Sequence, residues 1–98
     1  MLYLDCCRLC KTGPLRLRRC GSCASTWIVC DECDALWTSP DLSASPVIED
    51  SATLPCPGCG ASLWAAGSSW ATEEQARAEK WIADAIEAGQ LDLKNDPL

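Results

Sequence analysis

Alternating apolar and polar side chains predict a β-hairpin in the first third of the chain. Residues 15–19 have the sequence Leu-Arg-Leu-Arg-Arg, an alternation typical of a half-buried strand. Residues 24–29 are rich in β-branched and aromatic side chains, which favours a second strand with Trp27 and Ile28 as candidate core residues. The segment Cys20-Gly-Ser-Cys23 lies between the two strands and is expected to form the turn.

The last third of the chain has the periodicity of an amphipathic helix. Thr72 and Gln75 have the spacing of a capping box, and Gly89 is a suitable helix stop. Between them, apolar side chains recur at helical intervals at Ala78, Trp81, Ile82, Ala85 and Ile86. The pattern predicts one continuous helix over residues 73–88, about 24 Å long, with its apolar face packed on the rest of the domain.

The remaining segments are less regular. Residues 30–37, Cys-Asp-Glu-Cys-Asp-Ala-Leu-Trp, predict a short helical turn with acidic side chains at its N-terminal end. Residues 38–55 are rich in Ser and Pro and predict a long loop, anchored at Val47 and Ile48. We therefore expect a knuckle and hairpin module at 1–70, a helix packed on it at 71–89, and a loose tail at 90–98 in which Leu91 and Leu93 are able to fold back.

Cysteine content changes this picture most. A domain of 98 residues buries little apolar surface and needs additional stabilisation, such as disulfides or a structural metal. Eight of its nine cysteines form Cys-x-x-Cys pairs, the spacing with which two thiolates of one turn, or knuckle, bind one zinc ion. Thioredoxin-like redox motifs occur singly within a βαβ unit, and iron–sulfur ligands cluster differently. The sequence therefore predicts two structural Zn²⁺ ions held by Cys7, Cys10, Cys20, Cys23, Cys30, Cys33, Cys56 and Cys59.

The compartment follows from the same cysteines and from the N-terminal segment. Residues 1–10 lack the basic segment and the apolar run of a secretory signal, and no stretch is apolar enough to span a membrane. Thiolate ligands suit a reducing environment. We expect a cytoplasmic protein that has no membrane association.

Two pairings of the four knuckles use the same eight ligands. Sequential sites would join knuckles one with two and three with four, whereas interleaved sites would join one with three and two with four. The gaps between consecutive knuckles are nine, six and twenty-two residues, so the middle hairpin is short and central. This spacing favours the interleaved arrangement. The ninth cysteine, Cys6, is left outside because the x-x spacing selects Cys7.

Charge argues against nucleic acid as a partner. The formal net charge is −6, with five basic and four acidic side chains in residues 1–40 but three basic and ten acidic in residues 41–98. Nucleic-acid binding depends first on the neutralisation of phosphates by Lys and Arg. Arg16, Arg18 and Arg19 are a candidate phosphate-binding patch, although we favour a role in compensating the charge of the nearby thiolates.

Three segments resemble RING domains, which carry two interleaved zinc sites. The segment Cys7-Arg-Leu-Cys10 is similar to the first RING knuckle, residues 30–37 place a Trp four residues after the third knuckle, and Cys56-Pro-Gly-Cys59 is similar to the closing Cys-Pro-x-Cys. The resemblance covers residues 7–60. It implies a cross-brace, treble-clef fold with a groove for a ubiquitin-conjugating enzyme, lined by Leu9, Trp37 and Pro57. The first three knuckles equally resemble the ZZ zinc finger, a cross-brace that binds peptides. The chain has no histidine, whereas RING and ZZ domains usually use histidine ligands.

These observations define the expected class of protein. We predict a small zinc-stabilised α+β domain with two zinc sites, short β-hairpins and knuckles, and one C-terminal α-helix. Four thiolates close the coordination shell of each zinc, and no catalytic constellation is present. The expected function is an adaptor that binds another protein. A RING-like ubiquitin ligase is the enzymatic alternative, and a nucleic-acid-binding zinc finger is less favoured. The sequence does not indicate an oligomeric state.

Overall fold

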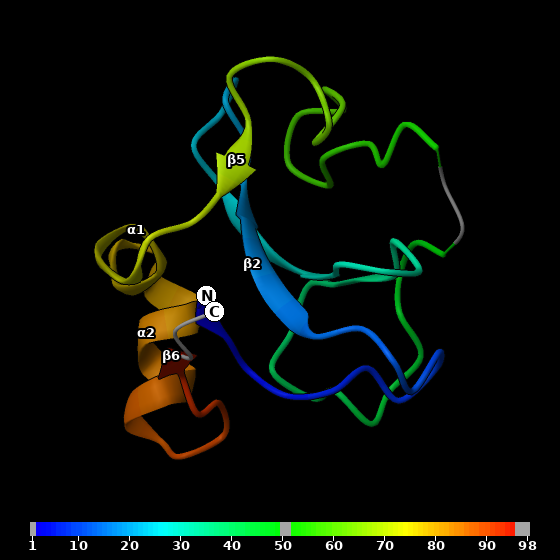
Figure 1. Ribbon diagram of the computed structural model, residues 1–98. Helices are drawn as coiled ribbons and strands as arrows, with labels where there is room; N and C mark the ends of the chain where they lie inside the picture. The colour runs from blue at the N-terminus through cyan, green and yellow to red at the C-terminus, as the bar shows by residue number, and fades with distance from the viewer. Residues whose placement is uncertain (1, 50–51, 96–98) are drawn as a thin grey trace.

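The fold is built on an antiparallel sheet whose two longest strands form the predicted hairpin. The computed structural model describes residues 2–49 and 52–95. Strands β2 (Leu15–Arg19) and β3 (Thr26–Cys30) pair with Leu17 opposite Ile28, and Cys20–Cys23 make the turn between them. Two-residue strands β4 (Leu36–Trp37) and β5 (Ser69–Trp70) complete the order β4-β3-β2-β5. Figure 1 shows β5 beside β2. The predicted α+β class is confirmed.

Both faces of this sheet are covered, each by its own core. Alternation along β2 and β3 sends Leu15, Leu17 and Ile28 to one face, where they pack with Trp37 and the helices in what we call the first core. The opposite face carries Val29, which packs with Leu36, Leu54 and Leu63 in a second core, flanked by Trp27, Trp64 and Trp70. A half-buried strand predicts only one apolar face. The second core forms because residues 54–70 fold back over the sheet.

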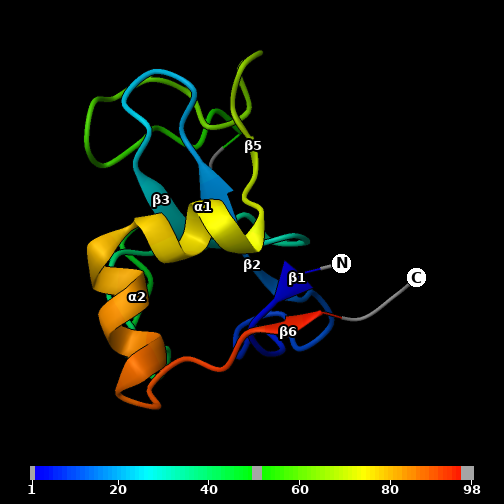
Figure 2. The ribbon, with the colours of Figure 1, turned by 90° about the vertical axis from the view of Figure 1, so that its left-hand side faces the viewer.

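The C-terminal helix differs from the prediction because it is broken at Glu79. Helix α1 spans Glu73–Ala78 and begins with the predicted Thr72 capping box, and α2 spans Lys80–Glu87. Glu79 has an extended backbone (φ −83°, ψ 114°), and its carboxylate accepts a hydrogen bond from the backbone N–H of Thr26 at 3.3 Å. Figure 2 shows the sharp bend between the helices, with α1 lying across β2 and β3.

Burial explains why the helix bends. Ala76 and Ile82 are both fully buried in the first core, and they are six residues apart. On a continuous helix their side chains would project about 120° apart, so one of them would leave the core. The break at Glu79 allows both to be buried, while Ala78, predicted as a core position, is exposed.

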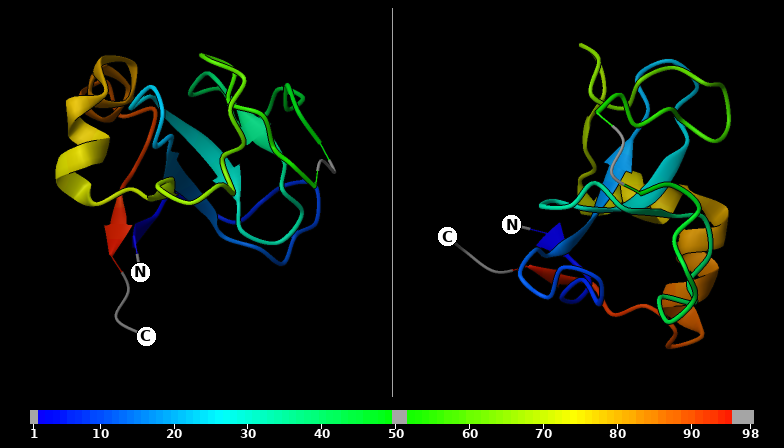
Figure 3. Two further views of the ribbon diagram at one scale, coloured as in Figure 1. Left: turned by 90° about the horizontal axis from the view of Figure 1, so that it is seen from above. Right: turned by 90° about the vertical axis from the view of Figure 1, so that its right-hand side faces the viewer.

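The tail also differs from the expected loose segment. Leu91 is 3 % exposed in the first core, and Lys94–Asn95 form β6, which pairs antiparallel with β1 (Leu2–Tyr3). Lys94 Nζ donates a hydrogen bond of 2.6 Å to the carbonyl of Leu4. Figure 3 shows β1 and β6 side by side at the edge of the molecule. Residues 96–98 of the predicted tail lie outside the described residues.

The short helical turn predicted over residues 30–37 is limited to a turn at residues 31–33, which does not continue as a helix. Asp34 has a positive φ of 61°, which reverses the chain so that residues 36 and 37 return as β4. Beyond β4, the predicted anchor of the long loop is half correct. Ile48 forms an isolated antiparallel β-bridge with Leu36 and packs on the second core, but Val47 is 59 % exposed.

Neither helix of the described chain has the length and the apolar run that crossing a bilayer requires.

Candidate metal centres

The four knuckles share one backbone conformation. In each, the residue directly after the second cysteine has a positive φ: 61° at Lys11, 65° at Ala24, 61° at Asp34 and 82° at Gly60. In three of them the N–H of that residue also donates to the carbonyl of the first cysteine, at 2.8 to 3.0 Å. This tight reversal brings both sulfurs of a knuckle to the same side. Only Gly60 was recognisable in the sequence as a residue suited to positive φ.

This shared geometry predicts that Ala24→Gly stabilises the protein. A non-glycine residue at positive φ costs about 1 to 2 kcal/mol, of which glycine's greater freedom in the unfolded chain cancels part. We expect a gain of about 0.5 to 1 kcal/mol in the unfolding free energy of the metal-loaded protein, measured by denaturant titration. Gly60→Ala should lower the stability. The added methyl group would meet no atom within 4 Å, so the effect would come from backbone strain alone. Destabilisation by Ala24→Gly would contradict this account.

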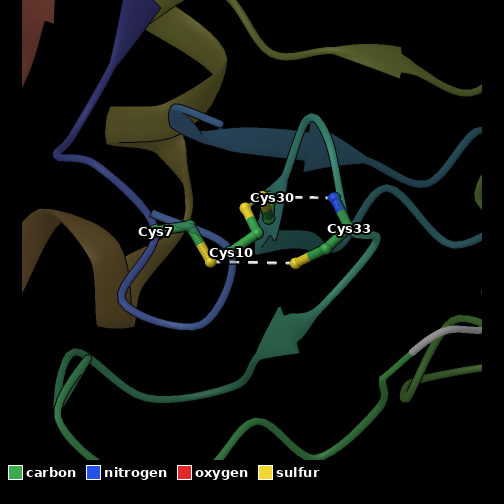
Figure 4. Close-up of side chains that lie close together, drawn as sticks. All are labelled: Cys7, Cys10, Cys30 and Cys33. Carbon is green, nitrogen blue, oxygen red and sulfur yellow. Dashed lines mark hydrogen bonds between the residues drawn. The ribbon is translucent and has the colours of Figure 1, made fainter. Parts of the chain in front are cut away.

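The eight sulfurs meet in two groups. Site A consists of Cys7, Cys10, Cys30 and Cys33, and site B of Cys20, Cys23, Cys56 and Cys59, with all ligand atoms of each site within 4.8 Å of one another. Knuckle one thus meets knuckle three, and knuckle two meets knuckle four, which is the interleaved arrangement. Figure 4 shows the four side chains of site A converging from two separate turns. Cys6 is exposed and belongs to neither site.

Sulfur separations fit a tetrahedral zinc site and exclude disulfides. Cys7 and Cys33 are 3.7 Å apart and Cys10 and Cys30 3.6 Å, and the two cross-knuckle pairs of site B have the same separations. Four sulfurs at the usual Zn–S distance of about 2.3 Å would be about 3.8 Å apart at the corners of a tetrahedron. A disulfide would need about 2.05 Å. The donor set and its spacing therefore fit one metal ion per site.

Backbone amides support the sulfurs as thiolates. In knuckles two, three and four the amide two residues after the first cysteine points at its sulfur, from Ser22, Glu32 and Gly58 at 3.3 to 3.4 Å. Such N–H groups stabilise the negative charge of a metal-bound thiolate. The first cysteine of every knuckle is buried, while the second is half-buried in site A and exposed in site B. Each metal would therefore lie between the domain interior and the surface.

The cysteine thiols of the two sites differ in pKa. Backbone N–H groups of Thr12 and Gly13 lower the pKa of Cys10 to about 6, and the hydroxyl and backbone N–H of Ser25 lower that of Cys23 to about 6. Burial raises the pKa of Cys30 and of Cys33. For Cys59, the backbone N–H of Ala61 lowers the pKa, but burial and the neighbouring thiols outweigh it and raise the pKa to about 11. A metal ion is what allows all four thiols of a site to ionise together.

In site B an indole N–H supports one of the sulfur ligands, a contact that sequence reasoning missed. The Nε1–H of Trp27 donates to the sulfur of Cys56 at 3.3 Å, and the Trp27 ring packs against Trp81 with centroids 6.2 Å apart. Trp27 was expected only as a core residue. The Nε1 of Trp81 is also buried, but it has no hydrogen-bond partner in the described part of the chain. Of the two tryptophans, only Trp27 therefore donates a hydrogen bond to a sulfur of site B.

That difference predicts distinct effects of two conservative substitutions. Trp27→Phe keeps an aromatic ring but removes the N–H···S bond, and loss of such a supporting contact lowers metal affinity by about 10- to 100-fold. We expect the Trp27→Phe protein to lose one of its two metal ions, that of site B, to a chromogenic chelator faster than the unsubstituted protein does. Trp81→Phe is the control, since it removes an N–H that has no partner. Equal release from both variants would show that the bond to Cys56 has no role.

The arginines contact tryptophans and carbonyls. Arg18 is 9 % exposed; its Nε donates to the Leu63 carbonyl at 2.8 Å, and its guanidinium lies over Trp64 and Trp70. Arg16 lies over Trp70 at 4.3 Å and forms an ion pair with Asp31 at 3.5 Å. Both side chains cover the second core. The partners of Arg16 and Arg18 are thus aromatic rings, carbonyl groups and one carboxylate, and the phosphate-binding patch and the compensation of thiolate charge stay predictions.

The three residues of the groove implied by the RING resemblance are not equivalent. Leu9 is 49 % exposed and Pro57 is exposed, but Pro57 lies in knuckle four of site B, whereas Leu9 lies in knuckle one of site A. Trp37 is 3 % exposed in the first core, and its Nε1–H donates to the Ala44 carbonyl at 2.9 Å. The ring of Trp37 thus fills the interior of the first core, and this burial weighs against the prediction that it lines a partner groove.

Comparison of the chain with models of protein families, with curated proteins and with solved structures gives no match.

Proposed function

We propose that sites A and B each hold one structural Zn²⁺ ion. The observation that carries the proposal is the pair of four-sulfur groups, with cross-knuckle separations of 3.6 to 3.7 Å in both. Zinc is the metal that most commonly occupies closed tetrahedral sites of four thiolates. A complete thiolate shell leaves no position for a substrate, so the metals act on folding and not on a reaction.

The function that fits such a scaffold is recognition of another protein, in the manner of cross-brace zinc fingers. The interleaved sites and the central hairpin agree with the treble-clef type of arrangement implied by the RING and ZZ resemblance. The chain has no histidine, which removes the commonest general base and metal ligand. Thiolate ligands near the surface, at Cys23 and Cys59, suit a reducing cytoplasm.

Two measurements test this proposal. Native mass spectrometry of protein purified without added metal should show two zinc ions per chain. Chemical cross-linking in cells, followed by purification under denaturing conditions, should then recover a defined protein at stoichiometric yield. Absence of zinc would contradict the metal assignment, and recovery of nucleic acid alone would contradict the protein partner.

The enzymatic alternative is a RING-like ubiquitin ligase. The exposed side chain of Leu9 on knuckle one favours it, because that position contacts the conjugating enzyme in the family resembled. The burial of Trp37 weighs against it. A conjugation assay in which Leu9→Ala abolishes activity would support the ligase, whereas activity that is absent or independent of Leu9 would exclude the mechanism.

Nucleic-acid binding is the least favoured function. The net charge is −6, and Arg16 and Arg18 are held over Trp64 and Trp70. If it did occur, its affinity would fall steeply with salt. We expect no retardation of DNA or RNA even at low ionic strength.

A further inference from the structure

We propose that a cavity beside site A docks a basic segment of a partner protein, in which one Arg or Lys side chain lies next to an apolar residue. The inference deepens the proposed function, on which it rests, by assigning the partner's chemistry and the surface that recognises it. It is carried by three observations: a cavity, its unpaired carboxylates and its apolar rim.

The cavity has a volume of about 290 Å³ and is formed by knuckles one and three together with the end of the long loop. Its wall includes Leu9, Ala35 and the two half-buried cysteines of site A, Cys10 and Cys33. Cavities that bind small molecules generally measure about 300 to 1,000 Å³. This one is at the lower limit, which suits a single long side chain better than a cofactor.

Among the described residues, all charged side chains in the wall are acidic. Glu32, Asp34 and Glu49 line the cavity, and no described Lys or Arg does. The ion pairs of the described residues involve Asp31, Glu73, Asp84 and Asp92, so none of the three carboxylates is neutralised in this way. The aliphatic part of Glu32 lies directly over Gly13, where a methyl group would come within 2.5 Å of Glu32 Cγ. The cavity is therefore suited to a cation.

The Zn²⁺ ion proposed for site A would increase the preference of the cavity for a cation. Four thiolates around one Zn²⁺ leave two negative charges at site A, next to the three carboxylates. A partly enclosed site of one sign concentrates the field on an incoming charge of opposite sign. Among the described residues, the groups able to converge on a metal ion are the two cysteine tetrads, so these carboxylates do not form a third metal site. An organic cation is the occupant that fits.

An exposed apolar side chain in the wall indicates what lies beside the cation. Leu9 is one of the two large hydrophobic side chains exposed on the described part of the chain, at 49 %. It lines the cavity directly, together with Ala35. A segment with an apolar residue next to its Arg or Lys would cover Leu9.

The test uses the full zinc-loaded protein labelled with ¹⁵N and a synthetic peptide, acetyl-Ala-Leu-Arg-Leu-Ala-amide. Titration to millimolar peptide should shift amide resonances of residues 9, 32, 34 and 49, and a peptide with Gln in place of Arg should not. The double variant Glu32→Gln/Glu49→Gln should weaken binding by about three- to tenfold, because it removes two of the three carboxylates in the wall. Leu9→Ser should also weaken it.

A matched control separates this surface from overall charge. Glu74→Gln/Glu87→Gln removes the same two charges from the helices and should leave the affinity unchanged. Shifts elsewhere, equal binding of the Gln peptide, or absence of binding to protein that retains two zinc ions would overturn the docking surface and leave the proposed metal sites intact. Loss of zinc from the unsubstituted protein would overturn both.

Discussion

Replacing Cys20 and Cys56 by serine is expected to unfold the whole domain. Both side chains are buried, at 0 % and 2 % exposure, and both are ligands of the proposed site B. A structural Zn²⁺ contributes about 10 to 16 kcal/mol to folding, whereas the net stability of a domain is about 5 to 15 kcal/mol. Loss of one ion therefore removes as much free energy as the native state has available.

The effect should not stay local, because the two sites are joined by one strand. Strand β3 begins next to knuckle two of site B and ends at Cys30 of site A, and it contributes to both cores. We expect loss of the thermal unfolding transition in circular dichroism and loss of both zinc ions in native mass spectrometry. Metal removal by a strong chelator should give the same result with the unsubstituted protein.

Cys6→Ser provides the matched control for this experiment. Cys6 is adjacent to the ligand Cys7, but it is exposed and lies outside both sites. The variant should keep two zinc ions and its unfolding temperature. A Cys20→Ser/Cys56→Ser protein with an unchanged spectrum and a cooperative transition would show that the hydrophobic cores suffice without metal.

The metal framework was the part of the fold most accessible from sequence. The spacing of the knuckles identified the eight cysteines that meet in the structure, and the short gap between Cys23 and Cys30 indicated the interleaved grouping. Ligand spacing is a local property that survives in any fold. The same reasoning located the β2–β3 hairpin, because strand alternation and a turn are also local.

Features that depend on distant segments were not accessible in this way. Periodicity predicted one helix, but the competing burial of Ala76 and Ile82 breaks it at Glu79. The tail segment Lys94–Asn95 becomes a strand because β1 offers it a partner about 90 residues earlier in the chain. Trp37 was placed on the surface by resemblance, whereas packing with the helices buries it. In each case tertiary contacts outweighed the local pattern.

Gly21→Ala should destabilise the protein by about 2 to 3 kcal/mol, although Gly21 is on the surface. A methyl group at this position would overlap the carbonyl carbon and oxygen of Gly67. Both atoms belong to backbone, so the clash is not relieved by a rotamer change. The N–H of Gly21 also donates to Ser68 Oγ at 2.9 Å, which ties knuckle two to the loop that covers the second core. Relief of the clash must therefore move knuckle two away from that loop.

Two controls isolate this close approach from loss of glycine itself. Gly58→Ala, in knuckle four of the same site, would place its methyl 3.4 Å from Ser25 Oγ, an ordinary contact, and should change stability little. Ser68→Ala removes only the hydrogen bond and should cost about 1 kcal/mol. Denaturant titration of the three zinc-loaded variants would rank their free energies of unfolding. If Gly21→Ala were no less stable than Gly58→Ala, knuckle two would not pack on residues 67 and 68, and the loop over the second core would be held by Arg18 and Leu63 instead.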